Sequence, residues 1–179
     1  MRKLTLIGLL MLSLTACVSQ YSISERQLSN YLNKEMHFEV KEGNRFFGLE
    51  MKINDVKVKL GHKADTMAIT ANSQVKVANP LMPLNATMTA EFEAKPWYDS
   101  DQHSLYLREL KLVKLTSNPK DLEQAMGELA PQVMRFITHF LETQPVYVLD
   151  TQEGNQALLA ELAKRIEVAP GKINLIFKD

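Results

Sequence analysis

The side chains that could do chemistry in this chain are few and far apart. It has one cysteine, Cys17, and four histidines, His37, His62, His103 and His139. A thiol or an imidazole can act as a nucleophile, a general base or a metal ligand, but each role needs partner groups at a fixed spacing. Neither a G-x-S-x-G elbow nor an H-E-x-x-H helix occurs in the sequence. The residues therefore predict no enzyme, no metal site and no cofactor.

One histidine has carboxylates close by, in Asp99-Ser100-Asp101-Gln102-His103. Counted as a calcium loop from Asp99, the stretch lacks the glycine at position six and has Leu110 where a bidentate acid is required. Asp and Ser favour turns because their side chains hydrogen-bond to nearby backbone. The stretch is predicted to be a hairpin turn.

Cys17 follows an apolar N-terminal segment. The segment Leu4–Leu14 is mostly apolar, and Thr15 and Ala16 place small residues directly before the thiol. Its eleven residues are too few to span a bilayer, which needs about 20, so the segment is predicted to be a signal and not an anchor. Leu14-Thr15-Ala16-Cys17 resembles the lipobox of bacterial lipoprotein precursors. The alternative is an ordinary cleavable signal with an unmodified cysteine behind it.

The lipobox resemblance implies that residues 1–16 are removed and that Cys17 becomes the first residue. Its sulfur would carry a diacylglyceryl thioether and its nitrogen an acyl chain such as palmitate. Each buried methylene contributes roughly 0.8 kcal/mol, so three chains would hold the protein on a membrane. Val18 is not the aspartate that commonly retains such lipoproteins at the inner membrane. The expected location is the outer membrane, on its periplasmic face.

The charge balance argues against a nucleic-acid partner. The chain has 21 basic and 21 acidic side chains, and the signal contains two of the basic ones, Arg2 and Lys3. Removing the signal leaves 19 basic and 21 acidic groups, which is a net charge of −2. Such a balance gives no electrostatic footprint for nucleic acid.

The N-terminal part of the mature chain predicts a short helix and then strands. Ser24 is a candidate N-cap, and Gln27 follows at the spacing of a capping box. The apolar face of this helix consists of Leu28, Tyr31 and Leu32. Beyond about residue 36 the pattern changes to alternation, most regularly over 67–77 and 84–94. Such alternation predicts long antiparallel strands with one apolar and one polar face.

In two other predicted strands, the apolar residues switch between odd and even positions partway along. Met51 and Ile53 occupy odd positions, whereas Val56, Val58 and Leu60 occupy even ones. The same kind of change occurs twice over 105–115, where the apolar residues are Leu105, Leu107, Leu110, Leu112, Val113 and Leu115. An extra residue that returns the apolar set to one face is a β-bulge, and bulges bend a sheet. The predicted sheet is strongly curved.

A long helix is predicted over about 120–142. Its apolar stripe recurs at steps of three and four and consists of Leu122, Met126, Leu129, Val133, Ile137 and Phe140. About 22 residues give a helix of roughly 33 Å, similar to a strand of about 11 residues, so a curved sheet could wrap the whole stripe. A short strand at 146–149, a second helix over about 155–165 and a final strand at 173–177 follow.

Three segments of the chain resemble the YceB-like family of bacterial lipoproteins. They are Tyr21-Ser22-Ile23-Ser24-Glu25, Gln144-Pro145-Val146-Tyr147-Val148-Leu149, and Ile166-Glu167-Val168-Ala169-Pro170-Gly171-Lys172-Ile173 leading into Phe177-Lys178-Asp179. None of them is a catalytic motif, and the family has no established function. The resemblance implies a fold similar to the tubular lipid-binding (TULIP) superfamily, in which a curved sheet rolls around a long helix and encloses an apolar tunnel.

The expected fold is therefore α+β. A strongly curved antiparallel sheet wraps one long helix, with a short N-terminal helix and a second helix near the C-terminus. The expected organisation is a signal peptide over 1–16, a lipidated tether over 17–23 and a single domain over 24–179. Seven methionines remain in the mature chain, and their flexible thioethers can pack around variable guests.

Alternating alanines on the strand 84–94 leave two interpretations open. Small residues either let the helix approach closely, which gives a packed core, or leave room for an apolar ligand. The residues expected to line such a ligand site are Ile53, Val56, Val58, Met67, Ile69, Val75, Leu84, Met88, Ala90, Phe92, Met126, Leu129, Val133 and Ile137. The expected function is that of an outer-membrane lipoprotein that binds or carries a phospholipid or fatty acid. The alternative is a non-enzymatic scaffold of envelope assembly with a packed interior and an unknown protein partner.

Overall fold

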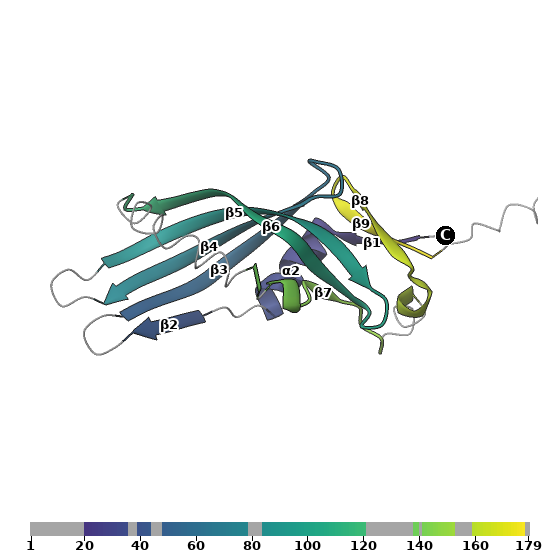
Figure 1. Cartoon of the computed structure of the whole chain (residues 1–179), viewed down its shortest axis with the longest axis horizontal. Coiled ribbons are helices and arrows are strands. Elements are labelled where there is room, and N and C mark those ends of the chain that lie inside the picture. The colour runs from purple at the N-terminus through teal and green to yellow at the C-terminus, as the bar shows by residue number, and fades with distance from the viewer. Residues whose placement is uncertain are drawn as a thin grey trace, which may run out of the picture.

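The protein is built mainly from antiparallel sheet. The computed structural model describes residues 20–35, 39–43, 48–78, 84–120, 138–139, 141–152 and 159–177. Within them, one sheet has the strand order β2-β3-β4-β5-β6-β7 and a smaller one has the order β1-β9-β8 (Figure 1). The bounds are β1 Gln20–Ser24, α2 Glu25–Glu35, β2 Glu39–Gly43, β3 Gly48–Leu60, β4 Met67–Ala78, β5 Leu84–Asp99, β6 Ser104–Asn118, β7 Tyr147–Val148, β8 Arg165–Ala169 and β9 Lys172–Ile176.

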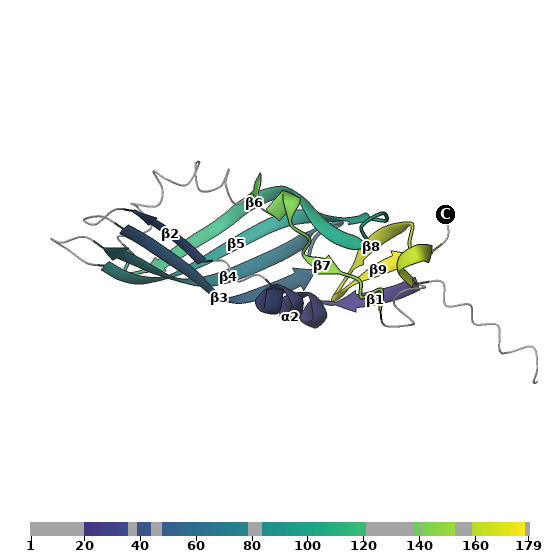
Figure 2. The ribbon, with the colours of Figure 1, turned by 90° about the horizontal axis from the view of Figure 1, so that it is seen from below.

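The four central strands of the large sheet, β3 to β6, are long and follow one another through short connections, and the sheet curves along its length (Figure 2). The alternating stretches predicted at 67–77 and 84–94 form β4 and β5, which pair along their length. The turn predicted at 99–103 joins β5 to β6. There the Asp99 carboxylate accepts hydrogen bonds from the backbone N–H groups of Asp101 and Gln102, at 2.9 and 3.1 Å. Local side-chain bonding therefore makes this stretch a turn.

The bulges predicted from parity changes are present. In β3 the register with β4 shifts between Ile53 and Asp55. In β6 the register with β5 shifts at two places. One contains Glu109, which has a positive φ of 55°. The other leaves Val113 without a partner on β5, and its side chain is 56% exposed. Val113 was expected to face inward, and this was wrong because it is the extra residue of the bulge.

The N-terminal helix begins as its sequence predicts. The backbone N–H of Ser24 donates to Oε1 of Gln27 at 2.9 Å, and the N–H of Gln27 donates to Oγ of Ser24 at 3.3 Å. These reciprocal bonds form a capping box and satisfy donors that the first turn leaves unpaired. Leu28 and Leu32 are buried on the inner face of α2.

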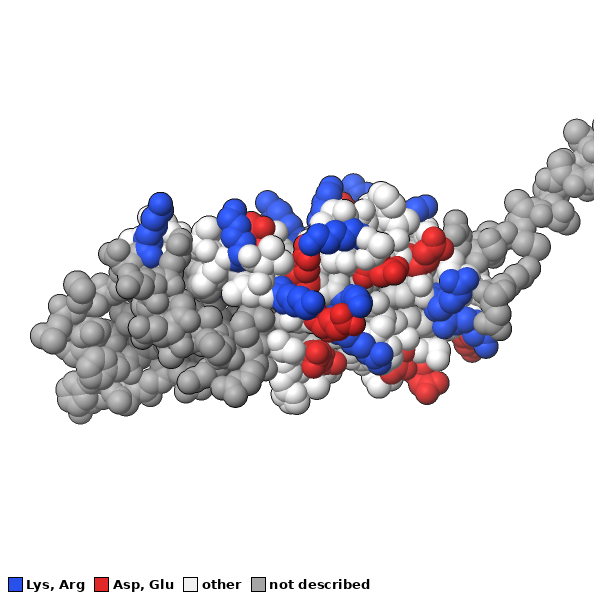
Figure 3. Space-filling view, turned by 45° about the horizontal axis from the view of Figure 1, so that its top comes forward, with Lys and Arg blue, Asp and Glu red and all other residues white. Residues whose placement is uncertain are grey.

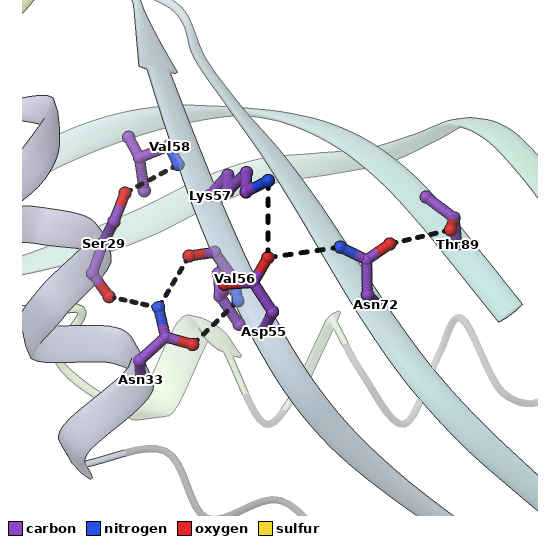
Figure 4. Close-up of polar contacts among 8 residues, drawn as sticks. All are labelled: Ser29, Asn33, Asp55, Val56, Lys57, Val58, Asn72 and Thr89. Carbon is purple, nitrogen blue, oxygen red and sulfur yellow. Dashed lines mark hydrogen bonds and ion pairs between the residues drawn. The ribbon is translucent and has the colours of Figure 1, made fainter. Parts of the chain in front are cut away.

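The outer face of α2 covers an unpaired edge of β3. Strand β2 pairs with β3 only as far as Lys52. Beyond it, Asn33 and Ser29 accept hydrogen bonds from the N–H groups of Val56 and Val58, at 2.8 and 2.9 Å (Figure 4). Ser29 and Asn33 are four residues apart, which is about 6 Å along a helix, and Val56 and Val58 are two residues apart, which is about 6.6 Å along a strand. The spacing of the two side chains on the helix therefore matches the spacing of the two N–H groups on the strand. The helix therefore replaces a neighbouring strand and protects the edge.

The same pattern continues toward the small sheet. Glu25 accepts a bond from the N–H of Leu60 at 2.8 Å, and the N–H of Gly171 donates to the carbonyl of Leu60 at 3.3 Å. On its other side α2 reaches β7, because the rings of Tyr31 and Tyr147 lie 5.2 Å apart. Helix α2 thus lies between β3 and β7, on the inner side of the curved sheet (Figure 2).

The main core lies where α2 and the small sheet pack against the large sheet. Ile23, Leu28, Leu107, Ile173 and Leu175 are all fully buried in it. They come from β1, α2, β6 and β9, so residues far apart in the chain close one core. Leu141 is partly buried and packs against the same cluster.

Three expectations about the chain's ends need correction. Residues 20–23 were expected in a tether, but they belong to β1, which pairs with β9. The second helix was expected to reach 165, but helical residues span 159–162 and Arg165 begins β8. Strand β8 was not predicted. The Pro170-Gly171 turn joins it to β9, where Gly171 has a φ of 78°.

The long helix predicted over 120–142 lies mostly outside the described residues. Residues 138, 139 and 141–143 are helical, and the Thr143 hydroxyl donates to the His139 carbonyl at 2.9 Å, as at a helix end. The rest of this helix, and the wrapping of the sheet around it, stay predictions. No helix among the described residues is long and apolar enough to cross a membrane.

Candidate ligand-binding face of the large sheet

The inward face of the large sheet is organised in rows that cross its strands. At the end near α2, one row consists of Val58, Ile69, Phe92 and Leu112, and the next places Leu60 opposite Met67 and Met67 opposite Ala94. All but Leu112 are buried, and all pack into or against the main core. We call these two rows the packed half. Its large side chains meet those of α2 and the small sheet.

The rows farther from the small sheet differ in side-chain size. The first is Val56, Ala71, Ala90 and Leu115; the second is Ile53, Ser73 and Met88; the third is Met51, Val75 and Ala86. We call these three rows the far half. In the central strands β4 and β5 they contribute four small residues, which we call the floor: Ala71, Ser73, Ala86 and Ala90.

The far half is shielded from solvent although its floor fills little space. Ser73, Ala86 and Ala90 are 5%, 6% and 7% exposed, and Val75 is 1% exposed. Val75 and Ala86 do not belong to the core cluster around α2, whereas Val56 and Ala90, in the row next to the packed half, do belong to it. Protein interiors pack densely, so other groups of the chain must cover these small residues.

Ser73 is the polar member of the floor. Its hydroxyl donates to the backbone carbonyl of Met88 at 3.3 Å, which is long for such a bond. A hydroxyl also has acceptor capacity beyond the proton it donates. Ser73 can therefore accept a hydrogen bond from a polar atom of a guest. Its row continues through Met88 to a second polar residue, Ser117 on β6.

The outer face behind the floor is polar and ties the strands together. Thr89 donates to Asn72 at 2.8 Å, and Asn72 donates to Asp55 at 3.3 Å, with Lys57 3.7 Å from the same carboxylate (Figure 4). This chain of contacts crosses three strands beside the β3 bulge, where the ladder is interrupted. Figure 3 shows acidic and basic side chains interspersed over the surface it views.

The groups with shifted pKa values lie away from the floor. Hydrogen bonds from Lys63 and His62 lower the pKa of Glu93, and the bond from Lys95 lowers that of Glu109. Burial raises the pKa of Tyr98 to about 12, and its hydroxyl donates to the Ala160 carbonyl at 3.2 Å. Glu93 and Glu109 form salt bridges at the surface, with Lys63 and Lys95 respectively. Tyr98 supports the packing of the helical turn at 159–162.

The described residues contain no group of three or more His, Cys, Asp or Glu side chains that could hold a metal ion. The turn at 99–103 therefore gathers no metal ligands. The sequence expectation of a non-enzymatic protein stays a prediction.

Nine of the expected lining residues have described side chains, and all nine lie on the inward face. Four of them belong to the packed half: Val58, Met67, Ile69 and Phe92. Val56 lies in the first row of the far half, where its backbone N–H bonds to Asn33 of α2. Ile53, Val75, Met88 and Ala90 lie in the far half. Leu84 belongs to β5, but its side chain is not described. Cys17, Met126, Leu129, Val133 and Ile137 lie outside the described residues.

The expected lining set omitted Ala71, Ser73 and Ala86. All three have the inward parity of their strands, so alternation alone could have identified them. The alternation over 67–77 and 84–94 places Ala71 and Ala86 inward, together with Ala90, which the set does include.

Several proteins with similar sequences carry the same descriptive name. "Uncharacterized lipoprotein YceB" of Escherichia coli (strain K12) is 26% identical over 166 residues, which cover 90% of this chain and 89% of that protein. The protein of that name from Salmonella typhimurium is 26% identical over 164 residues, which cover 89% of this chain and 88% of that protein.

Among solved structures, "Crystal structure of lipopolysaccharide binding protein" aligns with a TM-score of 0.40 and 11% sequence identity, covering 89% of this chain and 49% of that one. We base no argument on a likeness of this degree. The family described as "Protein of unknown function (DUF1439)" matches residues 23–172. This match covers most of the sequence, and the chain therefore belongs to the DUF1439 family, whose YceB lipoproteins resemble it along nearly their whole length.

Proposed function

We propose that this protein is a lipid-anchored envelope protein that binds an apolar ligand, a phospholipid or fatty acid, against the far half of its curved sheet. The proposal rests on the floor of the far half. The floor places four small side chains on two central strands, three of them buried, and the flexible side chain of Met88 lies beside them. An acyl chain suits such a surface because apolar sites of this kind bury most of a ligand and use few polar groups.

In this proposal the packed half and α2 close one end of the site. The helix predicted from the apolar stripe over 120–142 supplies the opposite wall, as in the TULIP-like arrangement that the sequence resemblance implies. Ser73 provides a polar contact within the site. The protein carries or holds its ligand without catalysis.

The ligand site is tested by filling it. Ala90→Trp, made in the chain from Val18 to Asp179, should abolish binding of a fluorescent fatty-acid analogue and leave the melting temperature nearly unchanged. Thr87→Trp is the control, because Thr87 is exposed on the same strand and faces outward. It should leave binding intact.

A loss of stability in Ala90→Trp, with no acyl binding by the parent, would favour a scaffold with a packed interior. In a packed core, Ala90→Trp would cost typically about 1–3 kcal/mol through overpacking. A parent chain that binds no acyl ligand, together with a destabilised Ala90→Trp variant, would contradict the proposed ligand site.

The anchor is proposed to be Cys17, at the outer membrane and facing the periplasm. The relatives' name and the lipobox resemblance support it. Cys17→Ala should block lipidation and leave the protein unprocessed or released from the outer-membrane fraction. Normal processing and outer-membrane fractionation of this variant would contradict the anchor.

A further inference from the structure

The small sheet begins three residues after the proposed anchor. The first pair of β1 places Gln20 opposite Ile176, and Ile176 lies opposite Arg165 on β8. These three residues form a row across one end of the small sheet. Figures 1 and 2 show this sheet at the opposite end of the molecule from β2 and its neighbouring strand ends.

Chain length limits how far this row can lie from a membrane. Gln20 is three residue steps beyond Cys17, and a fully extended chain spans at most about 3.6 Å per step, or roughly 11 Å in all. The headgroup layer of one leaflet is roughly 5–8 Å thick. If Cys17 is acylated, the row at Gln20 is held within a few ångströms of the headgroup surface.

The surface beside this row combines an apolar side chain with two cations. Leu162 is 50% exposed, and Lys164 and Arg165 are exposed. The backbone N–H of Lys164 donates to the carbonyl of Ile176 at 2.9 Å, which holds this segment against the row. Among the described residues, neither cation forms an ion pair, and two exposed acids lie nearby, Glu161 and, on the same face of β8 as Arg165, Glu167. Figure 3 shows basic side chains at this end.

Exposed large apolar residues are rare elsewhere in the described chain. The others are Val113 and Val148, both on the large sheet. Leu162 is therefore the one that lies next to the proposed anchor. An exposed leucine followed within three residues by lysine and arginine suits a lipid interface, where the apolar group enters the headgroup boundary and the cations meet lipid phosphates.

We propose that the end of the molecule formed by Leu162, Lys164, Arg165 and the Gln20 row docks on the surface of the anchoring bilayer. This proposal rests on the membrane anchor given above. Docking fixes the orientation of the domain, because the opposite end of the large sheet then points away from the membrane. The far half would face the periplasm and not its own membrane.

The test uses the lipidated protein in vesicles of phosphatidylethanolamine and phosphatidylglycerol. Because Cys17 is the one cysteine of the sequence and its thiol is taken by lipid, Leu162→Cys introduces a single free thiol for an environment-sensitive NBD dye. Val113→Cys is the matched control, since Val113 is 56% exposed on the large sheet. The dye at 162 should shift to the blue and be quenched by acyl-chain nitroxides. The dye at 113 should be quenched by aqueous iodide.

A charge reversal tests the role of the cations. Lys164→Glu with Arg165→Glu, combined with the dye at 162, should lose nitroxide quenching, whereas Lys52→Glu on the outer face of β3 should not. Vesicle-bound protein whose dye at 162 is as accessible to iodide as the dye at 113 would overturn the docking alone. Protein that never enters the vesicle fraction would overturn the anchor, and the docking with it.

Discussion

The two halves of the large sheet use the same strands but present different side chains. In the packed half, Phe92 and Leu60 meet residues from α2 and the small sheet in one core. In the far half, the same strands β4 and β5 present alanine and serine, which are also shielded from solvent. Pairing of β4 with β5 is continuous between the halves, although the β6 bulge at Val113 lies at their border. Along these two central strands the difference therefore lies in side-chain volume. One half is built for stability, and we propose that the other is built to hold a guest.

The largest expected effect comes from comparing two methionines. Met67 lies in the packed half and is fully buried, whereas Met88 lies beside the floor and is 8% exposed. Met67→Ala should cost about 2–5 kcal/mol of unfolding free energy because it leaves a cavity in a packed core. Met88→Ala should cost less than about 1.5 kcal/mol and weaken acyl-ligand binding. Urea unfolding of both variants checks this, and equal costs would mean that the halves are packed alike.

A pair of glycines tests how closely the small sheet approaches the packed half. Gly61 and Gly171 both have positive φ, but a Cβ at Gly61 would lie 2.6 Å from the backbone N of Pro170, whereas a Cβ at Gly171 would meet nothing within 4 Å. Gly171→Ala should cost about 1–2 kcal/mol from backbone strain alone. Gly61→Ala should cost an additional 1–3 kcal/mol or so, because two backbones must move apart. Thermal melts of both variants give the difference, and equal losses would argue against the close approach.

At the border between the halves, α2 covers the edge of β3. Asn33→Ala removes the acceptor of the Val56 N–H and should cost about 1–2 kcal/mol. Asn30→Ala is the control, because Asn30 is exposed on the same helix and the change in helix propensity is identical. It should cost less than about 0.5 kcal/mol. If hydrogen exchange at Val56 stays slow in Asn33→Ala, the side chain does not protect this edge.

The smallest expected effect concerns the outer face of the packed half. Lys63 and His62 hydrogen-bond to Glu93 and lower its pKa, so the ionised form is favoured in the folded state. The stability that Glu93 contributes is therefore present at neutral pH and is lost as the pH falls through its lowered pKa. Glu93→Gln should lower the melting temperature slightly near neutral pH and have no effect in strong acid. An equal change in melting temperature at neutral and at strongly acid pH would argue against this contribution of Glu93.

Local features of the fold were predictable because their causes are local. The capping box at Ser24, the turn after Asp99 and the bulges near Asp55 and Glu109 follow from side chains within a few residues. Strand β8 was missed although Ile166 and Val168 alternate, because the helical interpretation of 155–165 was extended too far. Strand β1 has one fully buried residue, Ile23, and its pairing partner lies near the other end of the chain.

The candidate site was predictable only in part for a related reason. The alternation of apolar and polar residues placed Met88 and Ala90 on the inward face. It could not show which part of that face belongs to the packed half and which to the far half. The division depends on where α2 and the small sheet pack, and those contacts join residues far apart in the sequence. Asn33 and Val56 are one example, since no local pattern relates a helix side chain to the edge of a later strand.

Native mass spectrometry of the chain from Val18 to Asp179, produced in the periplasm and purified without detergent, tests the central claim most directly. The floor in the far half predicts a population of protein carrying a bound lipid or fatty acid, and Ala90→Trp should remove that population while Thr87→Trp retains it. Folded parent protein that carries no lipid, and acquires none when mixed with phospholipid vesicles or fatty acid, would contradict the account.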